Sequence, residues 1–227
     1  LSGQKGFDLV ECVLNEIMAT GAQLAVLGMG ESKYVDLFSW AQWKYPGQVA
    51  ARFQMNEALA HRIYAGCDLF LMPSMFEPCG LSQMIALRYG TLPIARETGG
   101  LRDTVLSYNE FTGDGNGFTF LNYNAHDMLH VIERAVRMYH DDRATFDSLA
   151  RRAMQGLYGW DQSAQEYMRL YRDLTGAPEE APAKAPDAPA KKEEAPKKPR
   201  APRKKKDESA APSEKKTRAP RKKKTEE

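Results

Sequence analysis

The residues best suited to chemistry form the short segment EPCG at positions 77–80, a few residues after the apolar run 68–72. A residue before proline is driven toward extended backbone, so Glu77 is expected in a loop rather than in a helix. Gly80 lets a ligand approach the backbone closely, and the amides that follow it would open a helix and be free to bind an anion. A loop carboxylate that only caps or pairs with a neighbour stays an open alternative for Glu77.

A second glycine stretch, ETGGLRDTV at 97–105, follows another apolar run. The pair Gly99-Gly100 allows a tight turn with exposed amides ahead of a short helix, which suits a second cradle for phosphate or sugar. An ordinary strand-to-helix turn explains the same residues if they are taken alone. The segment LGMGES at 27–32 begins like a dinucleotide fingerprint, but Lys33 stands where the third glycine belongs, so no nicotinamide cofactor is predicted.

The elements that must position these residues alternate along the chain. Strands are predicted at 23–28, 48–53, 68–72, 91–95 and 116–121, and helices at 6–20, about 31–45, 57–66, 81–90, 124–138, 142–156 and 161–174. Strands that alternate with helices predict an α/β fold with a doubly wound parallel sheet. In such sheets ligands bind beyond the carboxyl ends of the strands, so both glycine stretches are expected at one edge.

The composition divides the chain into a globular domain, residues 1–176, and a tail, residues 177–227. The tail contains no aromatic residue and no Leu, Ile or Val, so it cannot bury enough apolar surface to offset the entropy of ordering and is predicted to be disordered. It is rich in Lys and Arg, and the sequence RAPRKKK occurs in it twice. Contact with nucleic acid or another anionic partner, and a merely solubilising extension, both remain open.

Three cysteines are present, and no pair of them has the spacing of metal ligands, so no metal site is predicted. Cys12 and Cys67 lie on apolar faces and are expected to be buried thiols, which fits a reducing, cytoplasmic location. The sequence has no signal peptide and no apolar run of about 20 residues, so no membrane association is predicted. The chain starts at Leu1 in what looks like the middle of a motif, and an upstream segment is expected.

Four stretches, in their order and spacing, resemble the C-terminal domain of bacterial glycogen synthases and plant starch synthases. They are QKGFDLV at 4–10, EALAHRIYAGCDLFLMPSMFEPCGLSQMIALRYGTLPI at 57–94, TGGLRDTV at 98–105 and GNGFTF at 115–120. These families are retaining α-glucosyltransferases with two Rossmann-like domains, the GT-B architecture. The resemblance covers about residues 1–172 and implies that the globular part is the Rossmann-like, nucleotide-sugar-binding half.

The activity implied by the resemblance is transfer of glucose from ADP-glucose to the non-reducing end of an α-1,4-glucan, with no cofactor. Lys5 then corresponds to the lysine that contacts the donor diphosphate, and Glu77 to the glutamate central to the active site. The loops that hold sugar and phosphates are matched by Cys79, Gly80, Leu81, Ser82, Thr98, Gly99 and Gly100. Met55 falls near the aromatic residue that often stacks on adenine. A diphosphate leaving group needs cations and amides that stabilise growing negative charge, which agrees with these assignments.

Several features depart from the family pattern. The arginine of R-L-x-x-Q-K-G would precede Leu1, and the N-terminal GT-B domain with its Lys-x-Gly-Gly-Leu loop is absent. That domain is therefore an expected partner, and the chain alone is expected to be inactive. Ile85 stands eight residues after Glu77, which argues against transferases with an E-x7-E pair. Two alternatives remain: another GT-B transferase that uses UDP-glucose, and a non-catalytic binding module with an anion-binding tail. Whether Glu77 acts as nucleophile, electrostatic stabiliser or hydroxyl-positioning group also stays open.

Overall fold

A computed structural model describes residues 1–156 and 158–176 of the chain. The tail predicted for residues 177–227 lies outside the described residues. None of the described helices is long and apolar enough to cross a membrane.

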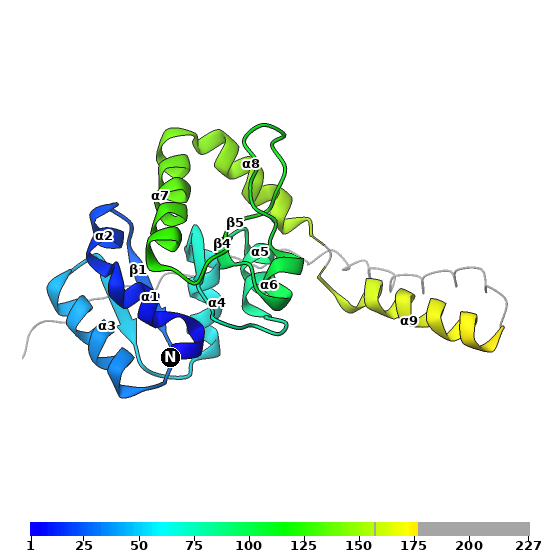
Figure 1. Ribbon diagram of the computed structural model, residues 1–227, viewed down its shortest axis with the longest axis horizontal. Coiled ribbons are helices and arrows are strands. Elements are labelled where there is room, and N and C mark those ends of the chain that lie inside the picture. Colours follow the sequence, from blue (N-terminus) through cyan, green and yellow to red (C-terminus); the bar gives the residue numbers. More distant parts are fainter. Residues whose placement is uncertain (157, 177–227) are drawn as a thin grey trace, which may run out of the picture. The chain divides into compact units, whose positions relative to one another are not determined.

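Helices and strands alternate through the described chain as the sequence predicts (Figure 1). The strands are β1 (Leu24–Leu27), β2 (Val49–Arg52), β3 (Leu69–Met72), β4 (Leu92–Arg96) and β5 (Phe118–Phe120). The helices are the short 3₁₀ turn η1 (Gly3–Lys5), α1 (Phe7–Cys12), α2 (Leu14–Ala19), α3 (Ser32–Lys44), α4 (Glu57–Gly66), α5 (Ser82–Tyr89), α6 (Gly99–Thr104), α7 (Ala125–Asp141), α8 (Arg143–Met154) and α9 (Trp160–Thr175).

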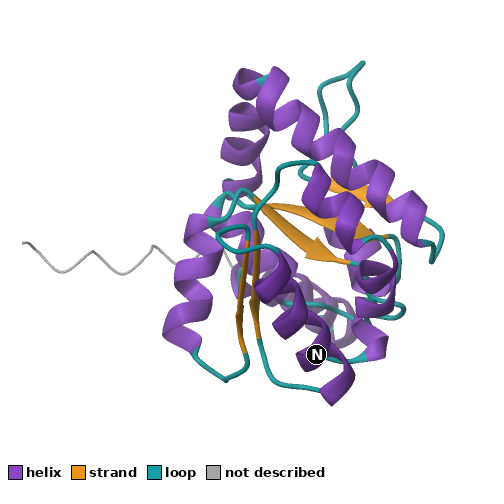
Figure 2. Cartoon of the chain, turned by 90° about the vertical axis from the view of Figure 1, so that its left-hand side faces the viewer, coloured by secondary structure: helices purple, strands orange, loops and turns teal. Residues whose placement is uncertain are grey.

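Every pairing between the described strands is parallel, which confirms the α/β class with parallel strands. The hydrogen bonds divide these strands into two sheets, β1-β2 and β3-β4-β5, which stand at an angle to each other in Figure 2. In the larger sheet Leu69 is in register with Leu92, and Ile94 with Phe118. Because the strands are parallel, the loops that follow β3, β4 and β5 leave the sheet at one edge, where both glycine stretches lie.

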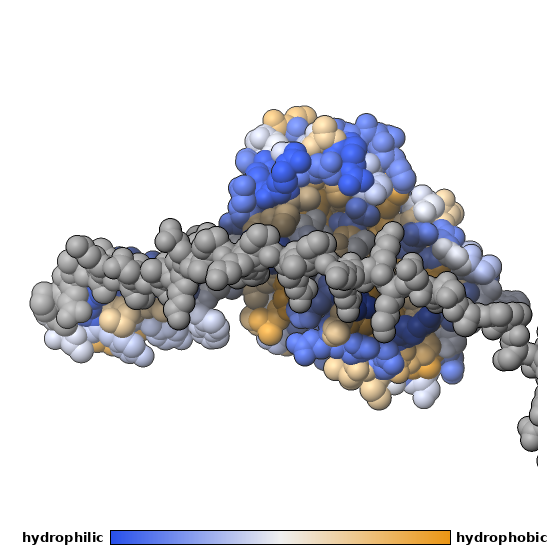
Figure 3. All heavy atoms as spheres, turned by 180° about the vertical axis from the view of Figure 1, so that it is seen from behind, coloured by the Kyte–Doolittle hydropathy of each residue, from blue (hydrophilic) through white to orange (hydrophobic). Residues whose placement is uncertain are grey.

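Buried apolar side chains from the helices and strands form the main core. Phe118 on β5, Met128 on α7 and Phe146 on α8 are almost completely excluded from solvent. Helix α7 packs against β4 and β5 and also against α1 and α2, while α8 packs against α5 and β4. One face of the molecule carries hydrophobic patches among hydrophilic residues (Figure 3).

The helix predicted over residues 6–20 is broken in the structure. Val13 leaves the helical region, with φ −121° and ψ 25°, and separates α1 from α2. The side chain of Val13 is fully buried in the core, so the break keeps this residue on the packed side of the segment.

The prediction that Cys12 is buried is wrong. Leu9, Val10 and Val13 form the buried face of this segment, whereas Cys12 ends α1 on the exposed side. Cys67 is half-buried. Burial raises the pKa of its thiol, and the negative charge of Asp68 raises it further by a smaller amount.

Candidate active site

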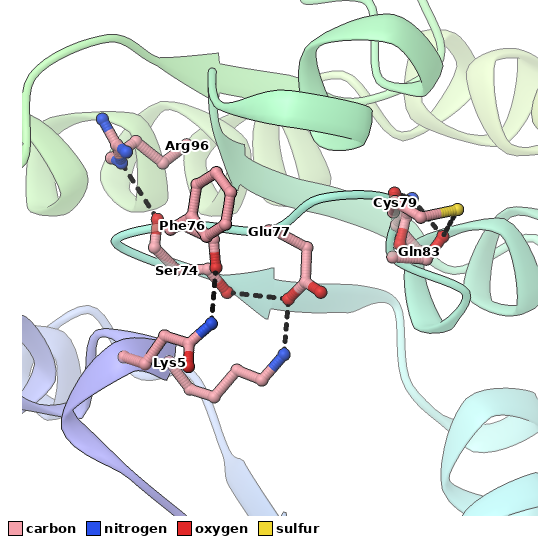
Figure 4. A network of polar contacts seen from close by, with 9 residues as sticks. Lys5, Ser74, Phe76, Glu77, Cys79, Gln83 and Arg96 are labelled. Carbon is pink, nitrogen blue, oxygen red and sulfur yellow. Dashed lines mark hydrogen bonds and ion pairs between the residues drawn. The ribbon is translucent and has the colours of Figure 1, made fainter.

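An ion pair joins the two residues that the sequence places at the centre of the site. The Lys5 Nζ atom lies 2.5 Å from Glu77 Oε2, although the residues are 72 positions apart (Figure 4). The Ser74 hydroxyl donates to the same oxygen at 3.3 Å. Glu77 is only 8% exposed, whereas the Lys5 side chain is 46% exposed. The Glu77 carboxylate is therefore largely buried, while the Lys5 ammonium group remains accessible to a ligand.

The turn that carries Lys5 is fixed against the loop after β3. The Gln4 carbonyl accepts the Met75 N–H at 2.9 Å, and the Gln4 side-chain amide donates to the Phe76 carbonyl at 3.2 Å. Gly6 follows with φ +76°, and a Cβ there would lie 2.0 Å from the Pro73 carbonyl oxygen. Only glycine allows this approach, so Gly6 belongs to the site although sequence reasoning gave it no role.

The two glycine stretches meet directly. A Cβ on Gly99, whose φ is +45°, would lie 2.1 Å from the Glu77 carbonyl oxygen, and a Cβ on Gly100 would lie 2.1 Å from that of Cys79. The Gly100 N–H donates to the carbonyls of both Glu77 and Pro78 at 3.1 Å. The expectation of an exposed amide is therefore wrong for Gly100, because the neighbouring loop uses that donor. Thr98 is the N-cap residue of α6. Its contact with a ligand stays a prediction.

Free amides are present where the first glycine stretch enters α5. Gly80 adopts φ +75°, Leu81 is the N-cap residue and Ser82 is the first residue of the helix. Within the described part of the chain, the N–H groups of Leu81 and Ser82 have no hydrogen-bond partner. Cys79 is exposed beside them. Unpaired amides at a helix start can bind a phosphate group.

Arg96 supports the site and was missed by sequence reasoning. Its Nε donates to the Ser74 carbonyl at 2.9 Å, and its terminal NH2 group donates to the Met75 carbonyl. The guanidinium also lies over the Tyr123 ring, whose hydroxyl donates to Asp8 at 2.5 Å. Burial, and then the Asp8 carboxylate, raise the pKa of Tyr123, which keeps the hydroxyl protonated. These contacts connect the loop before Glu77 to β4 and α1. In the sequence, the only indication of this role was a lone arginine at the end of an apolar strand.

Met55 is not among the residues that the structure brings together at the ion pair. It lies in the loop after β2 with 83% of its surface exposed, so its contact with a base stays a prediction. In residues 1–156 and 158–176, no group of three or more His, Cys, Asp or Glu side chains could hold a metal ion.

The loop after β3 contributes a buried carboxylate, which pairs with a partly exposed cation, and it leads to two unpaired amides at the start of α5. Cations and amides of this kind supply positive potential that suits an anionic group such as a diphosphate. The family model described as "Glycosyl transferases group 1" matches residues 1–153. The chain belongs to this family of glycosyltransferases.

Two proteins with similar sequences carry the name glycogen synthase. Glycogen synthase of Bacillus cereus strain B4264 is 56% identical over 174 residues, which are 77% of this chain and 36% of that protein. Glycogen synthase of Clostridium acetobutylicum is 53% identical over the same share of each chain. This glycosyltransferase chain therefore spans about a third of the length of the relatives that it matches.

A solved structure of similar fold is the catalytic domain of starch synthase IV from Arabidopsis thaliana bound to ADP and acarbose. It is 35% identical with a TM-score of 0.70, and the match covers 78% of this chain and 37% of that one. Sucrose-phosphate synthase from Thermosynechococcus elongatus matches with a TM-score of 0.56 at 23% identity over 77% of this chain and 43% of that one, which shows a shared fold.

Proposed function

We propose that this chain is the donor-binding part of a glycogen synthase. The reaction is transfer of glucose from ADP-glucose to the non-reducing end of an α-1,4-glucan with retention, without cofactor or metal, in the cytoplasm. The observation that carries the proposal is the pairing of Lys5 with the buried Glu77, in the loop that leads to the unpaired amides of Leu81 and Ser82. The 56% identity to a protein named glycogen synthase supports the substrate class.

The chemistry follows from where charge develops. As the bond from glucose to diphosphate breaks, negative charge grows on the phosphate oxygens, and the Lys5 ammonium and the loop amides stabilise it. Glu77 acts on the positive charge that develops at the sugar. Because Ser74 and Lys5 both hold one oxygen of its carboxylate, Glu77 keeps a fixed orientation when the donor arrives.

ADP-glucose is the preferred donor in this proposal. The starch synthase structure that is 35% identical contains ADP, whereas the solved structures with UDP or UDP-glucose are 16–20% identical. Met55 would then pack its thioether side chain against the adenine ring.

A second domain forms the other wall of the site in the complete enzyme, and it carries the acceptor. The relatives extend well beyond the region that this chain matches. Large apolar side chains stay exposed in the loops at the carboxyl ends of the strands: Met29, Met55, Met75, Phe76, Leu81 and Leu121. These side chains are suited to closing against such a wall, which would exclude water and position the glucan. The 227-residue chain alone should therefore bind the donor but not transfer glucose.

Isothermal titration of the 227-residue chain with ADP-glucose and with UDP-glucose tests the donor. Tighter binding of ADP-glucose is expected, and tighter binding of UDP-glucose would contradict the donor assignment. Incorporation of labelled glucose into glycogen by the full-length protein tests the reaction. A full-length protein that binds ADP-glucose without elongating glycogen would refute the synthase and favour a binding module.

A further inference from the structure

Gln83 is a polar residue in the interior of the fold, directly beneath the loop that carries Glu77. It is the second residue of α5 and has no exposed surface. Its side-chain nitrogen lies 2.8 Å from the Gly80 carbonyl oxygen, 3.1 Å from that of Cys79 and 3.1 Å from the Thr104 hydroxyl (Figure 4). One side chain therefore joins the loop to both α5 and α6.

The orientation of the Gln83 amide is fixed by its neighbours. Two of them are carbonyl oxygens, which can only accept. The third, the Thr104 hydroxyl, donates its own proton to the Gly100 carbonyl at 2.6 Å and can therefore only accept from Gln83. With the nitrogen turned toward all three, Gln83 Oε1 is buried without a hydrogen-bond partner among the described residues.

The unpaired Gln83 oxygen costs about 1–3 kcal/mol of stability. An apolar side chain of the same shape would avoid this cost but would leave the carbonyls of Cys79 and Gly80 without their donor. The amide is therefore better explained by what it does to the loop than by its contribution to packing.

Each carbonyl of the loop from residue 77 to residue 80 accepts a hydrogen bond. The Gly100 N–H takes the carbonyls of residues 77 and 78, and Gln83 takes those of residues 79 and 80. In a planar trans peptide the N–H of the next residue points opposite to the carbonyl. The amides of Gly80 and Leu81 therefore face away from Gln83, and that of Cys79 faces away from Gly100; none of the three is paired within the described residues.

We propose that Gln83 is a positioning residue that holds the peptide planes after Cys79 and Gly80 so that their N–H groups face the diphosphate of the donor. The inference rests on the proposed function for the identity of the ligand. Gly80 is required by the same arrangement, because a Cβ there would lie 2.4 Å from Gln83 Oε1. Without the Gln83 amide these peptides are free to turn. The anion then loses N–H donors that are already oriented toward it before it binds.

The test uses the Gln83→Glu variant of the 227-residue chain, with pyrophosphate as the probe. Glutamate keeps the shape but offers a carboxylate to two carbonyl oxygens, so the peptides should turn away. Titration calorimetry should show the Kd of pyrophosphate raised about tenfold or more, the equivalent of about 1.4 kcal/mol or a single charge-assisted hydrogen bond. In the wild-type chain, ¹⁵N-¹H spectra should show pyrophosphate shifting the amides of Gly80 and Leu81, and the variant should lose these shifts.

Three further variants serve as controls. Gln42→Glu controls for the added negative charge, because Gln42 is exposed and uses its side-chain oxygen to accept the Ala51 N–H, a bond that a carboxylate preserves. Its pyrophosphate Kd should equal that of the wild type. If Gln83→Glu fails to fold, Thr104→Val removes one anchor of the Gln83 amide without adding charge. Its Kd should rise, and Thr104→Ser should restore the wild-type value.

The outcomes separate this inference from the proposed function. A folded Gln83→Glu chain that has a lower melting temperature but a wild-type Kd would show a purely structural role and overturn the inference. So would a wild-type chain whose Gly80 and Leu81 amides do not respond to pyrophosphate. If those amides respond and the variant loses the response, but the full-length protein transfers no glucose from ADP-glucose, the inference stands and the proposed function fails.

Discussion

Gly100→Ala is the substitution for which the structure gives the most direct magnitude. The added Cβ would lie 2.1 Å from the Cys79 carbonyl oxygen and 2.7 Å from the Cys79 Cα, whereas ordinary contacts begin near 3.4 Å. The loop and the start of α6 must therefore separate by about 1.3 Å. Both atoms are backbone, so no side-chain rotation relieves the contact, and the Gly100 hydrogen bonds to the loop are strained as well.

A displacement of this size should reduce catalysis more than it reduces stability. A misplacement of about 1 Å can cost about 10²-fold in rate, and the forced carbonyls lie in the loop that carries Glu77. Overpacking of a tight contact typically costs about 1–3 kcal/mol of unfolding free energy. We expect full-length Gly100→Ala to melt at a lower temperature and to have about 10²-fold lower kcat for glucose transfer from ADP-glucose, measured well below that melting temperature.

Gly66→Ala is the matched control, because Gly66 is also helical, and a Cβ there meets no atom within 4 Å. Alanine at this last residue of α4 should be neutral or stabilise the helix by up to about 1 kcal/mol, with unchanged turnover. If Gly100→Ala keeps wild-type kcat and melting temperature, the contact between the two glycine stretches is not as close as the structure indicates. Equal losses of kcat in both variants would contradict the steric argument.

Three other predictions follow from the site. Full-length Glu77→Gln should lose kcat strongly with little change in donor KM, since the carboxylate acts on charge that develops only in the transition state; wild-type turnover would remove Glu77 from the mechanism. Lys5→Ala should lower kcat by about 10²–10³ and also raise donor KM, because the ground-state donor already carries phosphate charge; an unchanged steady-state profile would contradict this. Truncation at Ala177 should leave glycogen elongation intact, and a tenfold loss would assign the tail a catalytic role.

The elements that were predicted correctly carry their signals within a few residues. Asn56 and Asn124 accept hydrogen bonds from the first turns of α4 and α7, as helix caps do, and Gly90 ends α5 in a left-handed conformation. The division of the strands into two sheets had no such local signal. It depends on which segments pair, and the apolar runs of β1 and β3 look alike in sequence.

The site was predictable in part for the same reason. Lys5 and Glu77 were placed together by resemblance, while the residue types alone left Glu77 open as an ordinary loop carboxylate. Gln83 and Arg96 were not assigned: a polar residue in a short helix is usually solvated, and the lone arginine at the end of an apolar strand was only a weak signal. Their role depends on the carbonyl oxygens that they meet, and those oxygens belong to segments that fold against them from elsewhere in the chain.

The glycines show most clearly what a sequence leaves undetermined. Glycine beside a loop suggests close approach of a ligand, and the sequence was interpreted in that way at residues 80, 99 and 100. In the structure the nearest atoms to Gly6, Gly99 and Gly100 are carbonyl oxygens of the loop after β3, so these glycines let protein segments approach one another. The ligand donors arise indirectly. Once the carbonyls of residues 78–80 are held by Gly100 and Gln83, planarity turns the N–H groups of residues 79–81 away from these donors, so the proposed anion site would be a consequence of the contacts behind it.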